Sequence, residues 1–456
     1  MQAFFKSDLV NQYLKDIIKI SWPIIIGQLG MVFTGFFDTL MVGQLGTVEL
    51  AAAGISNSIF FFVAIFPLGV TMAFATIIGI LQGKNKTSSY HLLARDSFIV
   101  TLVLSVLASL VIVLFIHHFY LFEQTEEVTL LTKPYLKLLM WSLTPMLVFF
   151  FAKNICDGFS FTLGGMIVTI TALILNVFLN WVLIFGNLGF DAYGLNGAGY
   201  ATIISRIYLA FGMMALLFWS NKIPISLEAF LRGFVVKSRV YFYKKIITLG
   251  LPTGLQYFFE IAAFAGAAIM AGWLGAKELA AHNLAITLAS VTYMFAGGIS
   301  AGASICVAKA DGNKNLNNVY KYGLNGHLLG LIVMSVFAIM FFSINTELAA
   351  LFSEDREVIK LGAQLLILAA IFQLGDGIQA VSVGILRGIS DVQIPSIIVF
   401  VAYWIIAMPI GYWVANKTSP DFFYHGVNGI WVGLTIGLTL SAITLSYRFY
   451  LLIRRL

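Results

Sequence analysis

The segment Phe98-Ile-Val-Thr-Leu-Val-Leu-Ser-Val-Leu-Ala-Ser-Leu-Val-Ile-Val-Leu-Phe-Ile116 is predominantly apolar and contains no charged side chain. About 20 apolar residues are enough for a helix to cross the hydrocarbon core of a bilayer. A transmembrane β-barrel would instead show alternating strands of about ten residues. A helix satisfies its own backbone hydrogen bonds in lipid, so this segment predicts a membrane-spanning helix.

The composition of the whole chain supports the same conclusion. Of its 456 residues, 60% are hydrophobic and 11% are charged. Soluble domains average about 45–50% apolar residues and about 25% charged residues. The excess apolar surface must face lipid, so we predict an all-α polytopic membrane protein. Cys156 and Cys306 lie in apolar segments and form neither a disulfide framework nor a zinc motif. The first apolar segment lacks a cleavage site, so we expect it to be retained as a helix.

Apolar windows of about 20 residues predict twelve transmembrane helices. They lie near residues 18–40, 52–82, 96–117, 135–158, 163–186, 195–219, 246–270, 281–310, 322–343, 361–387, 392–415 and 427–451. The longest polar connection separates the sixth window from the seventh. We therefore predict an N-terminal six-helix lobe (1–219), a basic cytoplasmic linker (220–245) and a C-terminal six-helix lobe (246–456).

The two halves of the chain resemble each other at a constant offset of 229 residues. Pro23 matches Pro252, and the segment Gly43–Ala52 (GQLGTVELAA) aligns with Gly272–Ala281 (GWLGAKELAA). The matched prolines predict kinks in the first helix of each half. Six spans per half is an even number, so both halves should cross the membrane in the same direction. This predicts two parallel lobes related by a pseudo-twofold axis, with a cavity between them.

The placement of Lys and Arg predicts the orientation, because cytoplasmic loops are enriched in these residues. One side carries 19 of them and the other side carries 6, so we expect both termini to be cytoplasmic. This distribution also explains the net charge of +6 without nucleic-acid binding. The 19 are Lys6, Lys15, Lys19, Lys84, Lys86, Arg95, Lys222, Arg232, Lys237, Arg239, Lys244, Lys245, Lys309, Lys314, Lys321, Arg387, Arg448, Arg454 and Arg455; the 6 are Lys133, Lys137, Lys277, Arg356, Lys360 and Lys417.

Four carboxylates fall within the predicted spans: Asp38, Asp157, Glu260 and Asp376. A charge near the bilayer centre costs about 2.5–3.5 kcal/mol on insertion scales, so such a residue usually lines a cavity and has a function. Asp157 lies at the cytoplasmic end of its helix, where we interpret it as an interfacial residue.

Glu260 and Asp376 lie deeper, about 21 Å and about 16 Å from the cytoplasmic end at 1.5 Å per residue. Two nearby carboxylates cannot both stay ionised in a low dielectric without a counter-cation, and hard cations prefer oxygen ligands. The two residues therefore predict a Na⁺ or proton site. The alternative is a purely structural role, in which each carboxylate pairs with a buried hydroxyl or with Arg206. In the repeat Glu260 corresponds to Met31 and Asp376 to Met146, so the duplicated scaffold does not itself require these acids.

A second group of polar residues lies in the first half. Asn176 and Asn180 are four residues apart and share one helix face, and Asp38 lies near the outer end of the first span. Helix packing explains the asparagines equally well, and an interfacial position would explain Asp38.

Three segments carry a resemblance to a known family: Phe36–Gly43 (FFDTLMVG), Leu175–Trp181 (LNVFLNW) and Leu386–Asp391 (LRGISD). Together with the six-plus-six plan, they resemble the multidrug and toxic compound extrusion (MATE) family, and the chain is most similar to its bacterial NorM-type branch. The likeness extends over essentially the whole chain.

The resemblance implies a multidrug efflux antiporter that exchanges small organic cations for Na⁺ or H⁺ by rocking alternating access. It implies no enzymatic activity, no cofactor and no nucleic-acid partner, in a monomer surrounded by lipid in the bacterial inner (plasma) membrane. The implied site residues are Glu260 and Asp376 for cations in the C-terminal lobe, and Asp38, Asn176, Asn180 and Thr202 for a cation or proton in the N-terminal lobe. Phe372 and Asn180 depart from residues found in relatives, which leaves the coupling ion open.

Two other functions remain as alternatives. A lipid-linked or oligosaccharide flippase would favour basic residues in its cavity, for which only Lys153 and Arg206 are available. An intramembrane protease is suggested by Gly298–Gly302, which fits G-x-S-x-G, and by Leu374–Gly377, but the first lacks the strand–turn–helix context. The chain has no P-loop or HExxH motif, so we expect an ion gradient to supply the energy.

Overall fold

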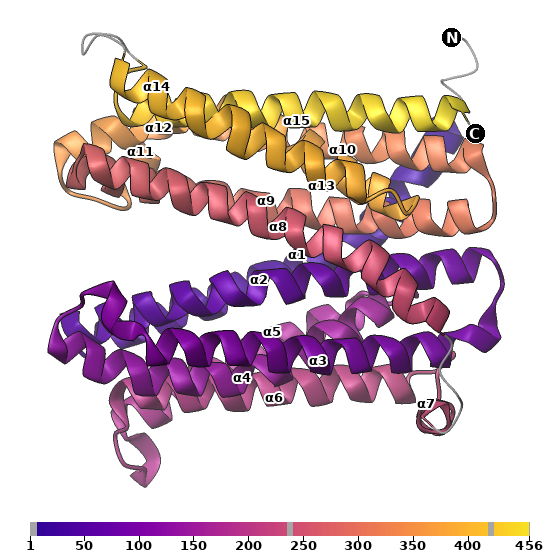
Figure 1. The fold of residues 1–456 in the computed structure, drawn as a ribbon, viewed down its shortest axis with the longest axis horizontal. Coiled ribbons are helices and arrows are strands. Elements are labelled where there is room, and N and C mark those ends of the chain that lie inside the picture. The colour runs from indigo at the N-terminus through magenta and orange to yellow at the C-terminus, as the bar shows by residue number, and fades with distance from the viewer. Residues whose placement is uncertain (1–6, 235–239, 418–423, 456) are drawn as a thin grey trace. The chain divides into compact units, whose positions relative to one another are not determined.

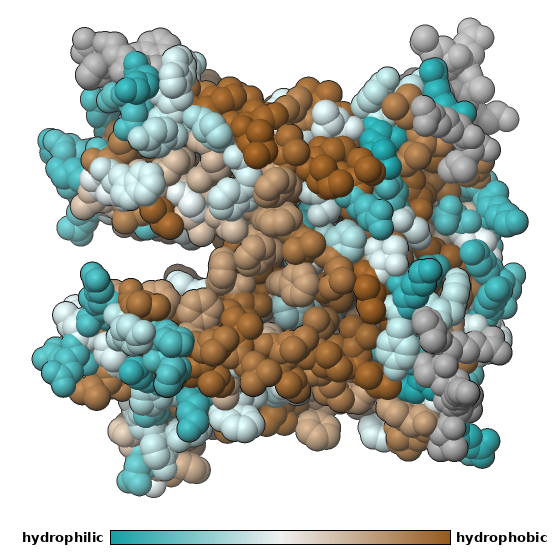
Figure 2. Space-filling view, viewed as in Figure 1, coloured by the Kyte–Doolittle hydropathy of each residue, from teal (hydrophilic) through white to brown (hydrophobic). Residues whose placement is uncertain are grey.

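The computed structural model describes residues 7–234, 240–417 and 424–455, and every regular element in these ranges is helical. Twelve of these helical segments are long and apolar enough to cross a membrane, which confirms the predicted number of spans. In each part of the chain apolar side chains gather along the middle of the helices, and hydrophilic ones gather at the helix ends (Figure 2). This is the surface expected of helices in a bilayer.

The helices run alongside one another within each half of the chain (Figure 1). The first six spans are α1 (Ser7–Gly43), α2 (Thr47–Gly83), α3 (Tyr90–His117), α4 (Glu126–Gly158), α5 (Leu163–Phe185) and α6 (Gly194–Trp219). The other six are α8 (Val240–Leu274), α9 (Ala276–Gly312), α10 (Leu316–Ser343), α12 (Arg356–Gly388), the segment α13 (Gln393–Phe400) with a π-helical turn (Val401–Ala407) and α14 (Met408–Lys417), and α15 (Val427–Arg455). Short helices α7 (Leu227–Gly233) and α11 (Asn345–Ala350) and 3₁₀ turns at Thr87–Ser89, Phe119–Phe122 and Asn187–Gly189 complete the fold.

The turns between helices repeat as the sequence does. Gly46 (φ 154°) and Gly275 (φ 155°) occupy the same place in the α1–α2 and α8–α9 connections, in a backbone region that L side chains rarely adopt. Three further pairs of positive φ angles lie at matched positions: Asn85 with Lys314, Ser160 with Ser390, and Gly194 with Gly426. The backbone duplication supports two six-helix halves with the same order of helices and turns.

Contacts divide the chain into two compact units whose borders fall inside helices. The N-unit is Ile26–Gly254, and the C-unit consists of the described residues up to Ile25 and from Leu255 onward. The two borders are again 229 residues apart, so the first part of α1 belongs to the C-unit and the first part of α8 to the N-unit. The predicted lobes, residues 1–219 and 246–456, instead placed the start of α1 with the first half of the chain and residues from 246 onward with the second half. Residues 235–239 of the predicted linker lie outside the described residues.

Glycines allow each of these helix segments to pack closely within its unit. In the C-unit a Cβ added at Gly298 of α9 would collide with Ile25 of α1. In the N-unit a Cβ added at Gly69 of α2 would lie 2.7 Å from the Cα of Gly254 in α8. The two contacts are equivalent, because Gly69 matches Gly298 and Ile25 matches Gly254 at the offset of 229.

Hydrogen bonds also hold the start of α1 in the C-unit. Tyr13 donates to Asn318 Oδ1 (2.9 Å), and Asp16 accepts from the hydroxyl of Tyr322 (2.8 Å). Phe449, near the end of α15, faces Gly323 of α10. The start of α1 and the end of α15 therefore lie at the same end of the C-unit.

The linker contains a helix that the sequence analysis did not predict. Phe230 of α7 is buried and packs against Phe98 (5.8 Å between ring centroids) and Phe218 (5.0 Å). Arg95 of α3, which pairs with Asp96 (2.6 Å), donates to the carbonyl oxygen of Gly233. These contacts attach the linker helix to the N-unit.

The glycine contacts lead to a stability prediction. Gly69→Ala and Gly298→Ala should each lower the free energy of unfolding by about 1–3 kcal/mol, because the new methyl group overpacks a helix contact. Gly35→Ala is the matched control, since a Cβ there has nothing within 4 Å. Thermal denaturation of the purified variants in detergent measures this difference. Equal melting temperatures for all three variants would show that these contacts are not tightly packed.

Candidate functional site

The side chain of Glu260 extends from α8 into the interior of the C-unit and is only 7% exposed. Its Oε1 accepts a hydrogen bond from Gln379 Nε2 (3.0 Å) and a longer one from the hydroxyl of Tyr403 (3.4 Å). The same hydroxyl lies 3.5 Å from Gln379 Oε1. Glu260 is thus held by two neutral groups, which position the carboxylate without neutralising it.

Asp376 of α12 belongs to the same cluster. It is 3% exposed, and its carboxylate interacts electrostatically with that of Glu260. The hydroxyls of Tyr293 and Tyr403 interact electrostatically with both acids. That the two acids bind one cation together stays a prediction.

The π-helical turn Val401–Ala407 brings two aromatic residues to this cluster. Tyr403, which is fully buried, points to Glu260, and the indole of Trp404 donates to the backbone carbonyl of Phe259 (3.0 Å). A π-helical turn is uncommon and often marks a functional site, because it rotates the following side chains out of the α-helical register. The turn therefore packs against α8 at Phe259 and Glu260.

A basic partner for either acid is missing from the part of the chain that the structure describes. No Lys, Arg or His forms an ion pair with Glu260 or Asp376 there. The available oxygen donors are two carboxylates, tyrosine hydroxyls and the Gln379 amide oxygen. This set suits a hard monovalent cation or a proton, and the negative charge suits an organic cation.

Asp157 lies at the end of α4, where the sequence analysis interpreted it as an interfacial residue. Its side chain is buried and pairs with Lys153 (2.6 Å), one helical turn earlier in the same helix. The neighbouring Asn154 donates to the hydroxyl of Thr71 in α2 (3.0 Å). In this ion pair each buried charge is balanced by the other, so the ammonium group of Lys153 is already neutralised and does not attract an anionic ligand.

The second predicted group lies within the N-unit. Asn180 Nδ2 donates to Asp38 Oδ1 and to Asn176 Oδ1 (3.2 Å), so the two asparagines and the aspartate form one network. Thr202 of α6 is buried, but its hydroxyl has no hydrogen-bond partner in the described ranges, and neither has Asn180 Oδ1. The structure therefore joins three of the four predicted residues and leaves Thr202 without a shown link to them.

Arg206 lies one helical turn after Thr202. Its Nη1 donates to the hydroxyl of Ser142 (2.5 Å), and its guanidinium stacks over the ring of Phe60, 4.5 Å from the centroid. Asp38 and Tyr135 interact electrostatically with this guanidinium. The sequence analysis gave Arg206 as an alternative partner of Glu260 and Asp376, but no ion pair joins it to either acid among the described residues.

The residues that sequence analysis missed are those that position Glu260. Gln379 lies three residues after Asp376 and so on the same face of α12, a spacing that could have indicated it. Tyr403 offered no such signal, because its direction depends on the π-helical turn.

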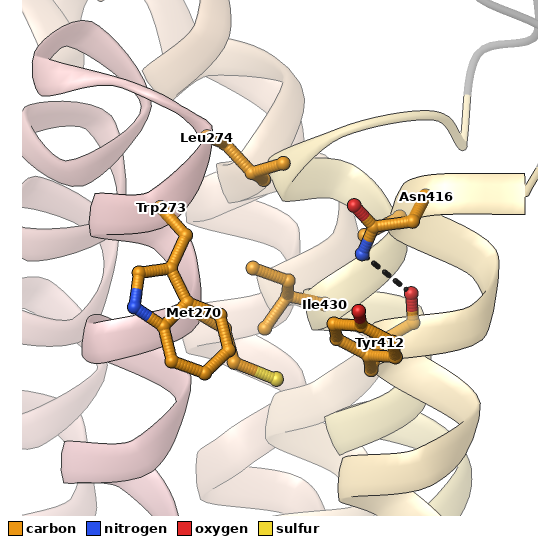
Figure 3. Close-up of a pocket in the computed structure, with 7 residues that line it drawn as sticks. Met270, Trp273, Leu274, Tyr412, Asn416 and Ile430 are labelled. Carbon is orange, nitrogen blue, oxygen red and sulfur yellow. Dashed lines mark hydrogen bonds between the residues drawn. The ribbon is translucent and has the colours of Figure 1, made fainter.

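A small pocket lies elsewhere in the C-unit, between α8, α14 and α15 (Figure 3). It measures about 40 Å³ and is lined by Met270, Trp273, Tyr412, Asn416 and Ile430, with Leu274 and Ala415 beside them. Asn416 Nδ2 donates to the backbone carbonyl of Tyr412 (2.8 Å). Sites for drug-sized ligands usually measure about 300–1,000 Å³, so this pocket is too small to be the substrate site.

Solved structures share the fold over nearly the whole chain. The eukaryotic MATE transporter AtDTX14 superposes with a TM-score of 0.84 (19% identity, 96% of both chains). The Vibrio cholerae MATE transporter VcmN in its bent form has a TM-score of 0.86 (18% identity, 98% of both chains). A Pyrococcus furiosus transporter of the MOP superfamily, described by the reverse polarity of its binding pocket, reaches 0.87 (20% identity, 97% and 96% of the chains).

Similar sequences point to the same family. The multidrug resistance protein NorM of Aliivibrio fischeri is 31% identical over 454 residues, covering 96% of this chain and 95% of NorM. The multidrug resistance protein MdtK of Proteus mirabilis is 28% identical, covering 97% and 96%. The MatE family model matches twice, at residues 23–182 and 252–413, which are the two halves of the repeat. The chain belongs to the MatE family of transporters.

Proposed function

We propose that this chain exports small organic cations, including drugs and dyes, in exchange for Na⁺ or H⁺ entering the cell. The names of the NorM and MdtK relatives support multidrug efflux. The observation that carries the antiport mechanism is the pair of buried acids, Glu260 and Asp376, without a basic partner in the described residues. Cations of two kinds can satisfy the same negative charge in turn.

Competition for this charge would couple the two fluxes. When the site faces outward, Na⁺ or H⁺ neutralises Glu260 and Asp376, and the bound organic cation loses its electrostatic attraction and leaves. When the site faces inward, the inorganic ion leaves to the cytoplasm and the next organic cation binds. Rocking of the two six-helix lobes would alternate access, as expected for parallel repeats.

The membrane potential can drive this exchange. An inside-negative potential contributes about 2.3 kcal/mol per elementary charge per 100 mV. A difference of one net charge per cycle therefore supplies about 50-fold accumulation at 100 mV. No chemical step on a substrate is part of this cycle.

The proposed location is the inner membrane of a bacterium, with both termini in the cytoplasm and the chain working as a lipid-embedded monomer. The excess of Lys and Arg on one side supports this orientation, although Lys6, Lys237 and Arg239 lie outside the described residues. The start of α1 and the end of α15 lie at the same end of the C-unit, as an even number of spans requires.

The geometry favours neither alternative function. Lys153, one of two candidate bases for a flippase cavity, is neutralised by Asp157. Ser300, the serine of the protease-like motif, sits inside α9 and donates to the carbonyl of Ala380 (2.6 Å). A helical serine held in this way lacks the exposed turn of a nucleophile elbow.

Neutralising the acids tests the mechanism. Glu260→Gln and Asp376→Asn should each lower ethidium export by at least about tenfold, since loss of one charge removes more than about 1.4 kcal/mol of cation binding. The assay is ethidium accumulation in cells with matched expression of each variant. The control Glu347→Gln removes an exposed carboxylate of the same unit and should export normally. Wild-type export by both site variants would exclude these acids from the mechanism.

Imposed gradients identify the coupling ion. Proteoliposomes given a Na⁺ gradient or a pH gradient, one at a time, should transport ethidium with at least one of the two, because either ion can neutralise the site. The same vesicles without any gradient provide the baseline. Transport that is independent of both gradients would contradict antiport.

Tyr403 provides a test of positioning. Tyr403→Phe removes one donor to Glu260, and a hydrogen bond to a charged group contributes about 1.5–3 kcal/mol. We therefore expect the half-saturating concentration of the coupling ion to change by about tenfold to about a hundredfold, with maximal export retained. Ethidium transport measured against ion concentration shows this; an unchanged ion dependence would show that the hydroxyl does not position Glu260.

A further inference from the structure

His282 of α9 is fully buried in the C-unit, where its Nδ1 accepts a hydrogen bond from the indole Nε1 of Trp431 in α15 (3.2 Å). Its other ring nitrogen, Nε2, has no hydrogen-bond partner in the ranges that the structure describes. Nδ1 accepts only when it carries no proton, so this bond requires the neutral imidazole. A histidine inside a membrane span is rare and usually has a function, and the proposed antiport cycle does not yet use this one.

Four aromatic rings form a continuous row in the C-unit, which we call the aromatic row: Trp431, Phe372, Phe264 and Tyr403. Successive ring centroids are 5.6, 6.1 and 5.7 Å apart, and each contact is edge-to-face, as aromatic pairs prefer. The hydroxyl at the end of the row donates to Oε1 of Glu260 (3.4 Å). The row therefore connects His282 of α9 to the buried acid of α8 by contacts between neighbouring side chains.

The rings of the aromatic row have almost no space in which to move. Trp431 and Tyr403 are 0% exposed and Phe372 is 2% exposed, while Phe264 is half-buried. Protein interiors are packed as densely as organic crystals, so a ring that shifts must displace its neighbour. Coupling between sites can be carried by such chains of packed side chains. A change in the orientation of the indole is therefore passed along the row towards the carboxylate.

The other half of the repeat lacks both ends of this arrangement. His282 corresponds to Ala53 at the offset of 229. Trp431 corresponds to Gly199 at the offset of 232 that aligns the turns before α6 and α15. A Cβ at Gly199 would lie 2.6 Å from a side chain of α4, so α6 has no room for an indole there. Two further ring positions have no aromatic counterpart either: Phe264 matches Gly35, and Phe372 matches Ser142. The duplicated scaffold does not require these residues, which occur in the half that carries the buried acids.

We propose that His282 is a positioning residue of the cation site, which acts through Trp431 and the aromatic row on Tyr403 and thereby sets the ion affinity of Glu260. The hydrogen bond from the indole fixes the first ring, and packing fixes the others in turn. The last ring places its hydroxyl on the carboxylate that must exchange cations. This inference rests on the proposed antiport function and adds to it a residue that lies outside the site.

Two substitutions of His282 test the role of its hydrogen bond. His282→Leu removes the acceptor, so the half-saturating concentration of the coupling ion should change at least about fivefold with maximal export retained, as expected for loss of one hydrogen bond. His282→Asn offers Oδ1 close to the place of Nδ1 and should stay within about twofold of wild type. Ethidium export by proteoliposomes, measured against ion concentration, gives both values. A lower maximal export with unchanged ion dependence in His282→Leu would show a structural histidine and overturn the proposal.

A double-mutant cycle shows whether the effect runs through Tyr403. His282→Leu combined with Tyr403→Phe should have an ion dependence within about twofold of Tyr403→Phe alone, because the hydroxyl through which His282 acts is already missing. Two effects that multiply would overturn the aromatic row as the route.

Trp431→Phe removes the donor and keeps a ring, so it should change the ion dependence as His282→Leu does. It carries the same test if His282→Leu does not fold, which gel filtration in detergent shows. The matched control is Trp273→Phe in the same unit, where the indole is 70% exposed. The control should keep the ion dependence of the wild type. A wild-type ion dependence in Trp431→Phe would contradict the proposal.

A second measurement does not depend on export. Coupling between two sites is reciprocal, so an ion that binds at Glu260 must also change the hydrogen bond of Trp431. In protein labelled with ¹⁵N-tryptophan, the indole signal that Trp431→Phe removes should shift as the coupling ion saturates the wild type, and it should stay fixed in Glu260→Gln. A Trp431 signal that is the same with and without the ion would overturn the proposal.

The outcome can be separated from failure of the antiport function itself. If Glu260→Gln and Asp376→Asn export normally, the antiport mechanism fails, whatever the His282 series shows. If those variants are inactive and His282→Leu keeps the ion dependence of the wild type, only the positioning role of His282 fails.

Discussion

Two carboxylates buried in one half of a membrane protein, with no basic residue paired to them in the part of the chain that the structure describes, form the constraint on which the proposed function depends. Removing a charge from water is costly, and the cost is met only by a partner of opposite sign or by a bound proton. At Glu260 the protein supplies neutral donors, Gln379 and Tyr403, which orient the carboxylate and leave its charge in place. The missing positive charge must therefore come from outside the protein. In the proposed cycle, this site binds the two kinds of cation alternately because it cannot remain without one.

The duplicated scaffold and the unduplicated charges have separate roles. Helices, turns and the glycine contacts of α1 and α8 repeat at matched positions, so the architecture follows from a sequence that occurs twice. Glu260 and Asp38 each occur in only one half. The Pyrococcus furiosus neighbour, with its reverse pocket polarity, shares the fold at a TM-score of 0.87. The fold alone therefore does not determine what is transported, and the sign and placement of a few charges must do so.

Sequence reasoning predicted the parts of the structure that depend on apolar length and periodicity. Twelve spans, the two halves and the candidate pair Glu260 and Asp376 could all be derived from runs of residues and from charges inside them. Tyr403 could not, because a π-helical turn changes which face its side chain occupies. Asp157 was interpreted as interfacial from its place at the end of its span; its spacing of four residues from Lys153 could have indicated their ion pair, but the burial of that pair depends on tertiary packing. The exchange of the first parts of α1 and α8 between units is a property of tertiary packing that no local pattern contains.

Competition between the two kinds of cation is the most direct test of this account. Ethidium binding to the purified protein in detergent, followed by fluorescence anisotropy, should weaken as Na⁺ or H⁺ concentration rises, and saturating ethidium should reverse the effect. The double variant Glu260→Gln, Asp376→Asn should bind ethidium weakly, with no dependence on either ion. Wild-type affinity for ethidium that stays constant across both titrations would contradict the account.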